Sequence, residues 1–359
     1  MNRTRKGAPR SLIEPRSLSS AAGLLCLAVA LAGCSDLLSI EIPGAVAADD
    51  LDDPALARTQ VVAALGEFEC SFIQFATTAG IITEEFRSSS TRRLTNIWNS
   101  RVLDIESAVG GCSGSRDADS FGYWAPMQTA RRLAEDGYER ISSFDPSEVP
   151  NHERKLADLS LYEGFSYLLL GEGYCGVTVN TGPLITRNGA FEIAEQLFTR
   201  ALGHAQAAGN ERIALAARGA RARARLNQGD LPGAASDAGA IPEGFRFDVN
   251  YSDAQVRREN RWHHLTENKR LTVGDDYIGL TVDGVPDTRV PVRDSGETGE
   301  DALTPWFEQL KVTSRNQNLP LVSYIEAQLI IAEAAAGTPE AVTAINNVRD
   351  HFDLPTYTG

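Results

Sequence analysis

ARLNQGDLPGAA, residues 224–235, places a Gly-Asp turn between two stretches that show helical periodicity. Gly229 is suited to ending a helix because glycine adopts left-handed backbone angles without strain. Ala234 and Ala235 follow the turn, and such small side chains let the next helix pack closely against its neighbour. The stretch therefore predicts one helix, a tight turn and a second helix.

Helical periodicity extends upstream from this turn. Residues 191–208 and 211–227 form two predicted helices joined by a Gly209-Asn210 turn. The turn at Gly229 resembles that of a tetratricopeptide repeat, whose helix pairs must stack on neighbours to bury their apolar faces. Further helices are expected near residues 55–79, 91–109, 123–141 and 152–170. The expected fold is mainly α, a tetratricopeptide-like α-α superhelix with a helical repeat region at residues 55–244.

The helical pattern fails between Phe245 and Pro320. Short runs at residues 270–273 and 288–292 alternate there with Gly, Asp and Pro, which is typical of strands and loops. The superhelix is therefore expected to carry an irregular, partly β insertion at residues 245–320. Loops held on a rigid scaffold often carry binding residues, so this insertion is a possible ligand-binding region.

The N-terminus has the pattern of an export signal. A basic segment is followed by an apolar run from Ala21 to Leu31, which is too short to cross a bilayer that needs about 20 helical residues. The run ends in Leu31-Ala32-Gly33-Cys34, which resembles the lipobox of bacterial lipoproteins. This resemblance implies a signal peptide at residues 1–33 and a lipid on Cys34.

A mature chain of this kind would begin with a tether at residues 34–54. Ser35 follows the lipidated cysteine where inner-membrane retention signals commonly have Asp, so the resemblance favours the outer membrane. Two or three acyl chains on one cysteine hold a soluble domain on a membrane surface. The expected location is therefore the outer membrane, with the lipid at Cys34 as the anchor.

The net charge excludes one class of partner. The chain has a formal net charge of −14, and removal of residues 1–33 would make the mature protein still more acidic. Nucleic-acid binding needs clustered basic charge, so no nucleic-acid partner is expected. The acidic balance mainly implies solubility.

Three cysteines remain after export: Cys70, Cys112 and Cys175. A disulfide is permitted outside the cytoplasm. We expect one bridge, between Cys70 and Cys175, since both sit beside apolar helical segments. Three buried free thiols are the alternative, and the sequence leaves it open.

The sharpest motifs lie near the C-terminal end. The chain reads YIEAQLIIAEA at residues 324–334, INNVR at residues 345–349 and Leu-Pro at residues 354–355. Two helices flanking a short turn are predicted. The three motifs resemble the SusD/RagB family, whose members carry a helix reading approximately Y-A-E-x-L-L-x-x-A-E-A, a second helix reading I-N-x-V-R and a Leu-Pro exit.

The resemblance spans most of residues 34–355, because the lipobox, tether and repeat pairs agree with the family as well. It implies a surface-exposed lipoprotein that binds a glycan or another oligomeric nutrient and delivers it to a SusC-like TonB-dependent transporter. The helix pairs would equally allow a lipid-anchored scaffold in envelope assembly, which is the alternative. Family members usually continue further, so residues 321–359 are expected to form a C-terminal helix pair without the family's C-terminal part.

No catalytic or metal-binding motif is found. His263 and His264 are adjacent, so they point apart on a regular element, and no H-E-x-x-H or Cys-x-x-Cys spacing occurs. A Walker loop and a nucleophile elbow are also missing from the sequence. We therefore expect a binding protein that is not an enzyme and uses no cofactor or metal.

A sugar ligand would be held by exposed aromatic rings that stack on its C–H faces. The better candidates are Trp262 and Trp306, because they lie in the irregular insertion. The further candidates are Trp98, Trp124, Tyr251 and Tyr277. Core packing is the alternative role for each of these rings.

Overall fold

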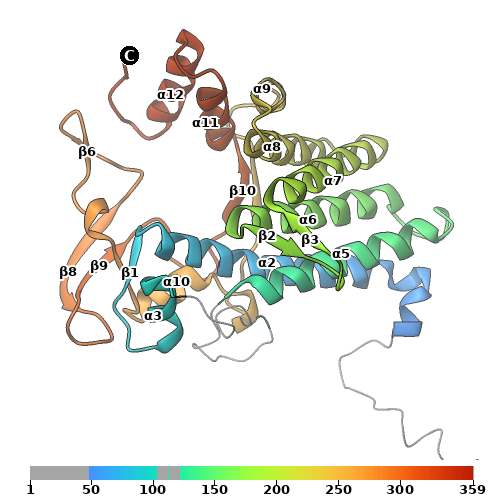
Figure 1. Ribbon diagram of the computed structural model, residues 1–359, viewed down its shortest axis with the longest axis horizontal. Helices are drawn as coiled ribbons and strands as arrows, with labels where there is room; N and C mark the ends of the chain where they lie inside the picture. The colour runs from blue at the N-terminus through green and yellow to red at the C-terminus, as the bar shows by residue number, and fades with distance from the viewer. Residues whose placement is uncertain (1–47, 103–111, 113–121, 359) are drawn as a thin grey trace, which may run out of the picture. The chain divides into compact units, whose positions relative to one another are not determined.

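The computed structural model describes residues 48–102, 112 and 122–358 (Figure 1). Contacts divide the chain into two compact units, Met1–Asp49 and Asp50–Gly359. The predicted signal peptide, Cys34 and most of the predicted tether lie outside the described residues. The α-helices and paired strands of the described residues all belong to the second unit.

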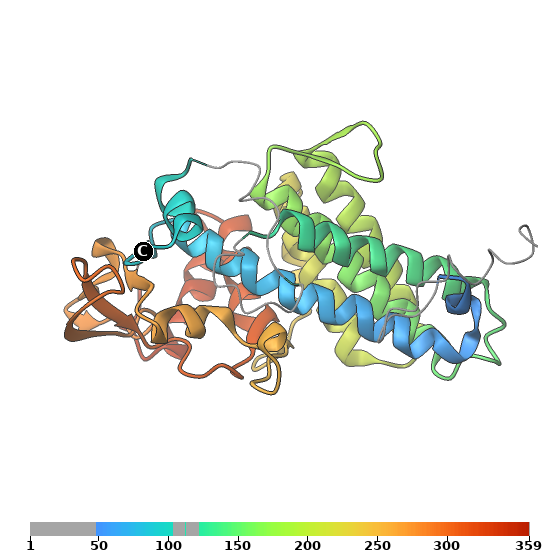
Figure 2. The ribbon, with the colours of Figure 1, turned by 90° about the horizontal axis from the view of Figure 1, so that it is seen from below.

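The second unit is mainly α-helical, which confirms the expected fold class. Its longer helices stack so that each contacts the helix before it in the stack (Figures 1 and 2). The stack consists of α2 (Ala57–Ile82), α5 (Trp124–Ser143), α6 (His152–Gly173), α7 (Arg187–Ala207), α8 (Glu211–Gln228) and α9 (Leu231–Ala238).

The turn between α8 and α9 forms as the sequence predicts. Gly229 ends α8 with a φ of 82°, in the left-handed region that favours glycine. Asp230 then caps α9, because its Oδ1 atom accepts a hydrogen bond of 3.1 Å from the backbone N–H of Gly233. The two caps reverse the chain over two residues, so that α9 packs back on α8.

Helix α6 lies at the centre of the stack, where it contacts α2, α5, α7 and α8. Its residues Leu161, Phe165 and Leu168 are fully buried. At Gly164 the helix approaches α7 so closely that a Cβ atom would lie 2.6 Å from the Phe198 ring. The apolar core is therefore built around α6, with small residues where helices cross.

The strands form two-stranded antiparallel sheets. The pairs are β1 (Phe86–Ser88) with β5 (Leu271–Val273), β2 (Gly176–Thr178) with β3 (Leu184–Thr186), β4 (Arg246–Val249) with β10 (Leu319–Ser323), β6 (Thr281–Val282) with β7 (Val285–Pro286), and β8 (Val292–Thr298) with β9 (Pro305–Gln309). Two short helices accompany them, α3 (Arg93–Ser100) and α10 (Arg261–Glu267).

Of the two short runs in the insertion, one forms a strand and the other mostly a turn. Residues 271–273 are extended as β5, whereas the run at residues 288–292 reaches strand geometry only at Val292. Asp287 accepts a hydrogen bond of 3.0 Å from the backbone N–H of Arg289, and this local turn competes with sheet pairing. Pro291 has no N–H to donate to a neighbouring strand.

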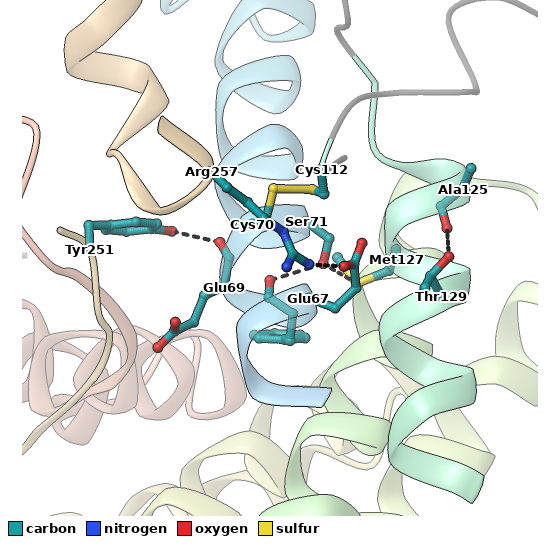
Figure 3. Close-up of a disulfide and its surroundings, with 11 residues drawn as sticks. Glu67, Glu69, Cys70, Ser71, Cys112, Ala125, Met127, Thr129, Tyr251 and Arg257 are labelled. Carbon is teal, nitrogen blue, oxygen red and sulfur yellow. Dashed lines mark hydrogen bonds and ion pairs between the residues drawn. A yellow bond between two sulfur atoms is a disulfide. The ribbon is translucent and has the colours of Figure 1, made fainter. Parts of the chain in front are cut away.

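The insertion is fastened to α2. Arg258 donates to the Glu69 carboxylate at 3.0 Å, and Arg257 forms an ion pair with Glu67 two residues earlier on the helix (Figure 3). The Tyr251 hydroxyl donates to the backbone carbonyl of Glu69. The region predicted as a loop-rich insertion therefore packs on the helical stack as part of the same unit.

The expected disulfide is wrong. Cys70 is joined to Cys112, with the two Cα atoms 5.7 Å apart, and Cys175 is a free, exposed thiol (Figure 3). The expectation assumed that Cys175 continues the buried face of the helix before it. Helix α6 ends at Gly173, so Cys175 lies past the helix and its side chain turns to solvent.

The C-terminal motifs form two helices, α11 (Tyr324–Ala334) and α12 (Pro339–His351), as predicted. Ser323 caps α11, since its Oγ atom accepts a hydrogen bond from the backbone N–H of Glu326. Helix α11 contacts α8, α9 and α12. The helix pair therefore extends the stack beyond α9.

Candidate functional site

A cleft of about 590 Å³ lies between the C-terminal helix pair and the β4–β10 sheet. We call it the C-terminal cleft. Its lining includes three aromatic side chains and three polar ones that bear on ligand binding. These are Phe245, Tyr324, Phe352, Arg246, Asn347 and Asp350.

Two of the aromatic residues are positioned by the end of the β4–β10 sheet. Ser323 at the end of β10 pairs with Arg246 at the start of β4. One residue further, the Tyr324 backbone N–H donates a 2.9 Å hydrogen bond to the Phe245 carbonyl. Both rings pack partly on the small apolar core between α8, α9 and α11 and remain half-buried. Their backbones are therefore held rigidly beside the cleft.

The third aromatic residue, Phe352, follows α12. Its carbonyl accepts a hydrogen bond of 2.5 Å from the Thr288 hydroxyl, which ties the end of α12 to the insertion. The ring meets the His351 ring edge-on, with centroids 4.9 Å apart. Half-buried aromatic rings at the start of α11 and just after the end of α12 therefore line the cleft.

The polar side chains of the cleft differ in whether they already form hydrogen bonds or ion pairs within the protein. Arg246 donates to Asp248 and to the Asn318 carbonyl, and Asn347 donates to Gln328 at 2.7 Å. The exposed Asp350 side chain forms no hydrogen bond or ion pair with any described residue. Free carboxylate oxygens accept hydrogen bonds from hydroxyl groups, so Asp350 is available to a polyhydroxylated ligand.

Three of the six predicted aromatic residues are buried, which corrects the expectation that their rings are exposed. Trp98 is 1% exposed, Tyr251 7% and Trp306 8%. The Trp98 ring packs on Tyr123, and the Trp306 indole N–H donates to the Leu271 carbonyl. Trp98 belongs to a second apolar core, which the insertion forms against the end of α2, whereas Tyr251 belongs to the main core.

Trp262 and Tyr277 are half-buried at the margin of that second core. The Trp262 ring meets the Phe86 ring edge-on at a centroid distance of 5.0 Å, and its indole N–H is buried and has no hydrogen-bond partner among the described residues. Neither residue lines the C-terminal cleft. Their role in ligand binding stays a prediction.

Trp124 lines a separate groove of about 430 Å³ between α5 and the β2–β3 hairpin. We call it the Trp124 groove. Arg132 and Asn180 also line it, and Asn180 is held by a 2.8 Å hydrogen bond from Arg131. Trp124 is the predicted aromatic residue that the structure places in a hollow together with polar side chains.

Three arginines of α8 pair with acids of neighbouring helices. Arg221 binds Asp237 through two hydrogen bonds of 2.7 and 2.8 Å, and Arg225 contacts Glu195 at 2.8 Å. Arg223 lies between Glu172 of α6 and Glu326 of α11. These arginines hold the helices together, so the basic character of α8 does not by itself indicate an anionic ligand.

Sequence reasoning did not single out Phe245, Tyr324 or Phe352 as ligand-binding residues. Tyr324 opens the YIEAQLIIAEA motif, which pointed to a family and not to a cleft. Phe245 lies just before β4 and Phe352 just after α12, where burial cannot be inferred from helical periodicity. The available signal was the position of Tyr324 and Phe352 at the two motif helices, and no such signal marks Phe245.

Within residues 48–102, 112 and 122–358, no group of three or more His, Cys, Asp and Glu residues is arranged to hold a metal ion. In the same part of the chain, no helix combines the length and the apolar character that spanning a membrane requires.

The comparisons with known proteins concern the fold. No family model matches the chain, and no curated protein matches it. A SusD-like carbohydrate-binding protein from Bacteroides vulgatus superposes with a TM-score of 0.57 at 12% identity, over 86% of this chain and 77% of that one.

Two further solved structures agree. The surface glycan-binding protein A from Bacteroides uniformis gives a TM-score of 0.58 at 13% identity, covering 84% of this chain and 81% of that one. A SusD superfamily protein from Parabacteroides distasonis gives a TM-score of 0.50 at 10% identity, covering 88% and 83%. The chain therefore has the SusD-like fold.

Proposed function

We propose that the chain binds a glycan or another oligomeric nutrient at the outer-membrane surface and delivers it to a SusC-like TonB-dependent transporter. The observation that carries the proposal is the presence, within a SusD-like fold, of a cleft that combines half-buried aromatic rings with a free carboxylate. The names of two similar structures describe carbohydrate-binding and glycan-binding proteins. Binding without catalysis is accordingly proposed for this chain.

The chemistry of the C-terminal cleft suits an oligosaccharide. Tyr324 and Phe352 offer flat rings for the C–H faces of sugar rings, at a small cost in conformational entropy. Asp350 accepts hydrogen bonds from hydroxyl groups, while Arg246 offers guanidinium N–H donors. A volume of about 590 Å³ lies in the usual range for small-ligand sites and would hold a few sugar rings.

Affinity gel electrophoresis over a panel of glycans tests the site. With a glycan that retards the wild-type protein, the Tyr324→Ala and Phe352→Ala variants should each lose most of the retardation. Stacking contacts contribute about 1 kcal/mol or more each, which corresponds to roughly a fivefold or greater loss of affinity. Circular dichroism establishes that the variants are folded.

Trp124→Ala is the matched aromatic control, because Trp124 lies in a different groove. It should bind the glycan like the wild type if the C-terminal cleft is the site. Loss of binding in Trp124→Ala alone would move the site to the Trp124 groove. Unchanged binding in all three variants would contradict both locations.

The partner is tested by affinity purification from the native membrane. The proposal predicts that a TonB-dependent β-barrel is recovered with the chain and that recovery depends on Cys34. Recovery of envelope-assembly factors without a transporter would instead favour the lipid-anchored scaffold. Labelled palmitate should enter the wild type and not the Cys34→Ser variant.

A further inference from the structure

A second large cleft lies where α2 begins and where the connection from α5 reaches α6. This N-terminal cleft measures about 770 Å³. Its lining includes Arg58 of α2 together with Arg154 and Lys155 of α6. Three cations in one hollow are unusual in a chain whose net charge is −14.

The positive charges of the N-terminal cleft are poorly neutralised. Arg58 is exposed and forms no ion pair with any described residue. Lys155 donates to the Pro150 carbonyl, which carries no net charge. Arg154 approaches Asp158 only to 3.8 Å. Burial, followed by the nearby Arg154 and Arg58, lowers the pKa of Lys155, which shows that the cations repel one another.

Two carboxylates also line the cleft, Asp158 and the exposed Glu148. The cations still outnumber them. The first turn of α6, a helix of 22 residues, adds the positive end of its dipole, and Asn151 gives that turn no side-chain hydrogen bond. An anion placed between the three cations would relieve their repulsion and meet these free backbone N–H groups.

The remaining wall of the cleft is apolar. Pro54, Val61 and Val62 line it, and Val62 is 59% exposed. Cations beside exposed aliphatic groups match a molecule that joins a phosphate to a hydrocarbon, and free phosphate would leave the aliphatic groups in water. Residue 54 is also the end of the predicted tether. The statement that the N-terminal cleft lies near a membrane rests on the proposed lipid anchor at Cys34.

We propose that the N-terminal cleft binds the phosphate group of an anionic lipid headgroup at the membrane surface. Arg58 and Arg154 supply the forked donors that suit phosphate oxygens, and Lys155 adds a point charge. Val62 contacts the glycerol and the first part of the acyl chains. The cleft would thereby orient the helical stack on the membrane to which the lipid tethers it.

Vesicle flotation tests the proposal with the chain beginning at Ser35, which lacks the lipid and keeps the whole unit Asp50–Gly359. The protein should float with phosphatidylglycerol vesicles and not with phosphatidylcholine vesicles. Each basic residue at a membrane surface contributes about a fivefold factor, so the Arg58→Gln/Arg154→Gln variant should bind about 25-fold more weakly. Both side chains are exposed, so the variant should fold.

Arg218→Gln on α8 is the matched control, because Arg218 is also a cation but does not line the cleft. It should bind the vesicles like the wild type. Flotation that is equal in the double variant and the wild type would overturn the proposal. Binding of inorganic phosphate by titration calorimetry, without flotation, would overturn the lipid assignment in favour of free phosphate. Glycan retention is measured on the same variants, so failure here is distinguishable from failure of the proposed function.

Discussion

Arg223 joins three helices through two carboxylates. It binds Glu172 of α6 through hydrogen bonds of 2.8 and 2.6 Å and Glu326 of α11 at 3.1 Å. Burial raises the pKa of Glu326, and the neighbouring Arg223 opposes that rise. Glu326, the first glutamate of the YIEAQLIIAEA motif, therefore attaches the C-terminal helix pair to the repeat helices.

Replacing Arg223 should destabilise the protein. In Arg223→Met, Glu172 and Glu326 would be left half-buried without a cation, at a cost of about 2 kcal/mol. The loss should be largest at neutral pH, because at acidic pH the carboxyl groups take up protons. Urea denaturation at neutral pH and at acidic pH measures the loss in the free energy of unfolding. Arg218→Met, on the same helix, should change stability little, because Arg218 forms no ion pair within the part of the chain that the structure describes. An equal loss in both variants would contradict this role for Arg223.

Asp158 is a half-buried acid that costs stability at neutral pH. Burial raises its pKa from 3.8 to about 6, against the smaller lowering effects of Arg154 and Lys155. The folded state therefore binds the proton more tightly than the unfolded chain. Protonated Asp158 therefore contributes to the free energy of unfolding. This contribution is fully present below pH 3.8 and is lost as the pH rises through about 6.

Asp158→Asn should accordingly stabilise the protein at neutral pH, by about 1 to 2 kcal/mol. The gain should shrink toward zero near the unfolded-state pKa. Denaturation curves at several pH values measure the difference. Asp145→Asn should behave in the opposite sense, because hydrogen bonds from Ser147 lower the pKa of Asp145. A gain for Asp158→Asn that does not vary with pH would show that charge burial is not its cause.

The sequence shows which aromatic residues are present, but it does not show whether their side chains are buried or exposed. It indicated that aromatic rings bind the ligand, but Trp98, Tyr251 and Trp306 are buried by segments that are distant in the chain. Burial depends on which segments pack together, and local patterns do not carry that information. Trp124 lies beside a groove, but its role in ligand binding stays a prediction, and sequence reasoning did not single out Phe245 or Phe352.

At the scale of single elements, the helix crossings depend on glycine. A Cβ atom at Gly164 of α6 would lie 2.6 Å from the Phe198 ring of α7, whereas at Gly203 of α7 nothing lies within 4 Å. Gly164→Ala should therefore cost about 1 to 3 kcal/mol by overpacking. Gly203→Ala should gain about 0.5 kcal/mol, since alanine favours the helix.

Thermal denaturation of the two glycine variants checks this contrast. Both changes add one methyl group to a helix interior, so helix propensity affects them equally. The difference between them reports the packing of α6 on α7. Equal melting temperatures would contradict the tight crossing at Gly164.

Helices were predictable from the sequence because their signal is local. The helix expected near residues 152–170 is α6, His152–Gly173, and the pair near residues 191–227 is α7 and α8. In the insertion the sequence left strands and irregular loops open, and residues 288–291 form a turn that Asp287 and Pro291 favour. Pairings such as β1 with β5 join segments far apart in the chain, and no local pattern specifies them.

At the scale of the whole second unit, the C-terminal cleft arises from segments that meet only in the folded chain. Phe245 precedes β4, Tyr324 begins α11, and Phe352 follows α12. The sequence predicted α11, α12 and the end of the insertion separately. It could not predict that the β4–β10 pairing brings Phe245 beside Tyr324, because that pairing links residues seventy or more positions apart.

The Cys70–Cys112 disulfide links α2 to a residue 42 positions further along the chain. Closing a loop of this length lowers the entropy of the unfolded chain by an amount equivalent to about 4 kcal/mol, and measured effects are typically about 2 to 4 kcal/mol. Cys112→Ser should therefore lower the melting temperature, and a reductant should lower that of the wild type equally. Cys175→Ser should leave it unchanged, because the Cys175 thiol is free and exposed. A Cys70–Cys175 peptide in an unreduced digest would contradict this pairing.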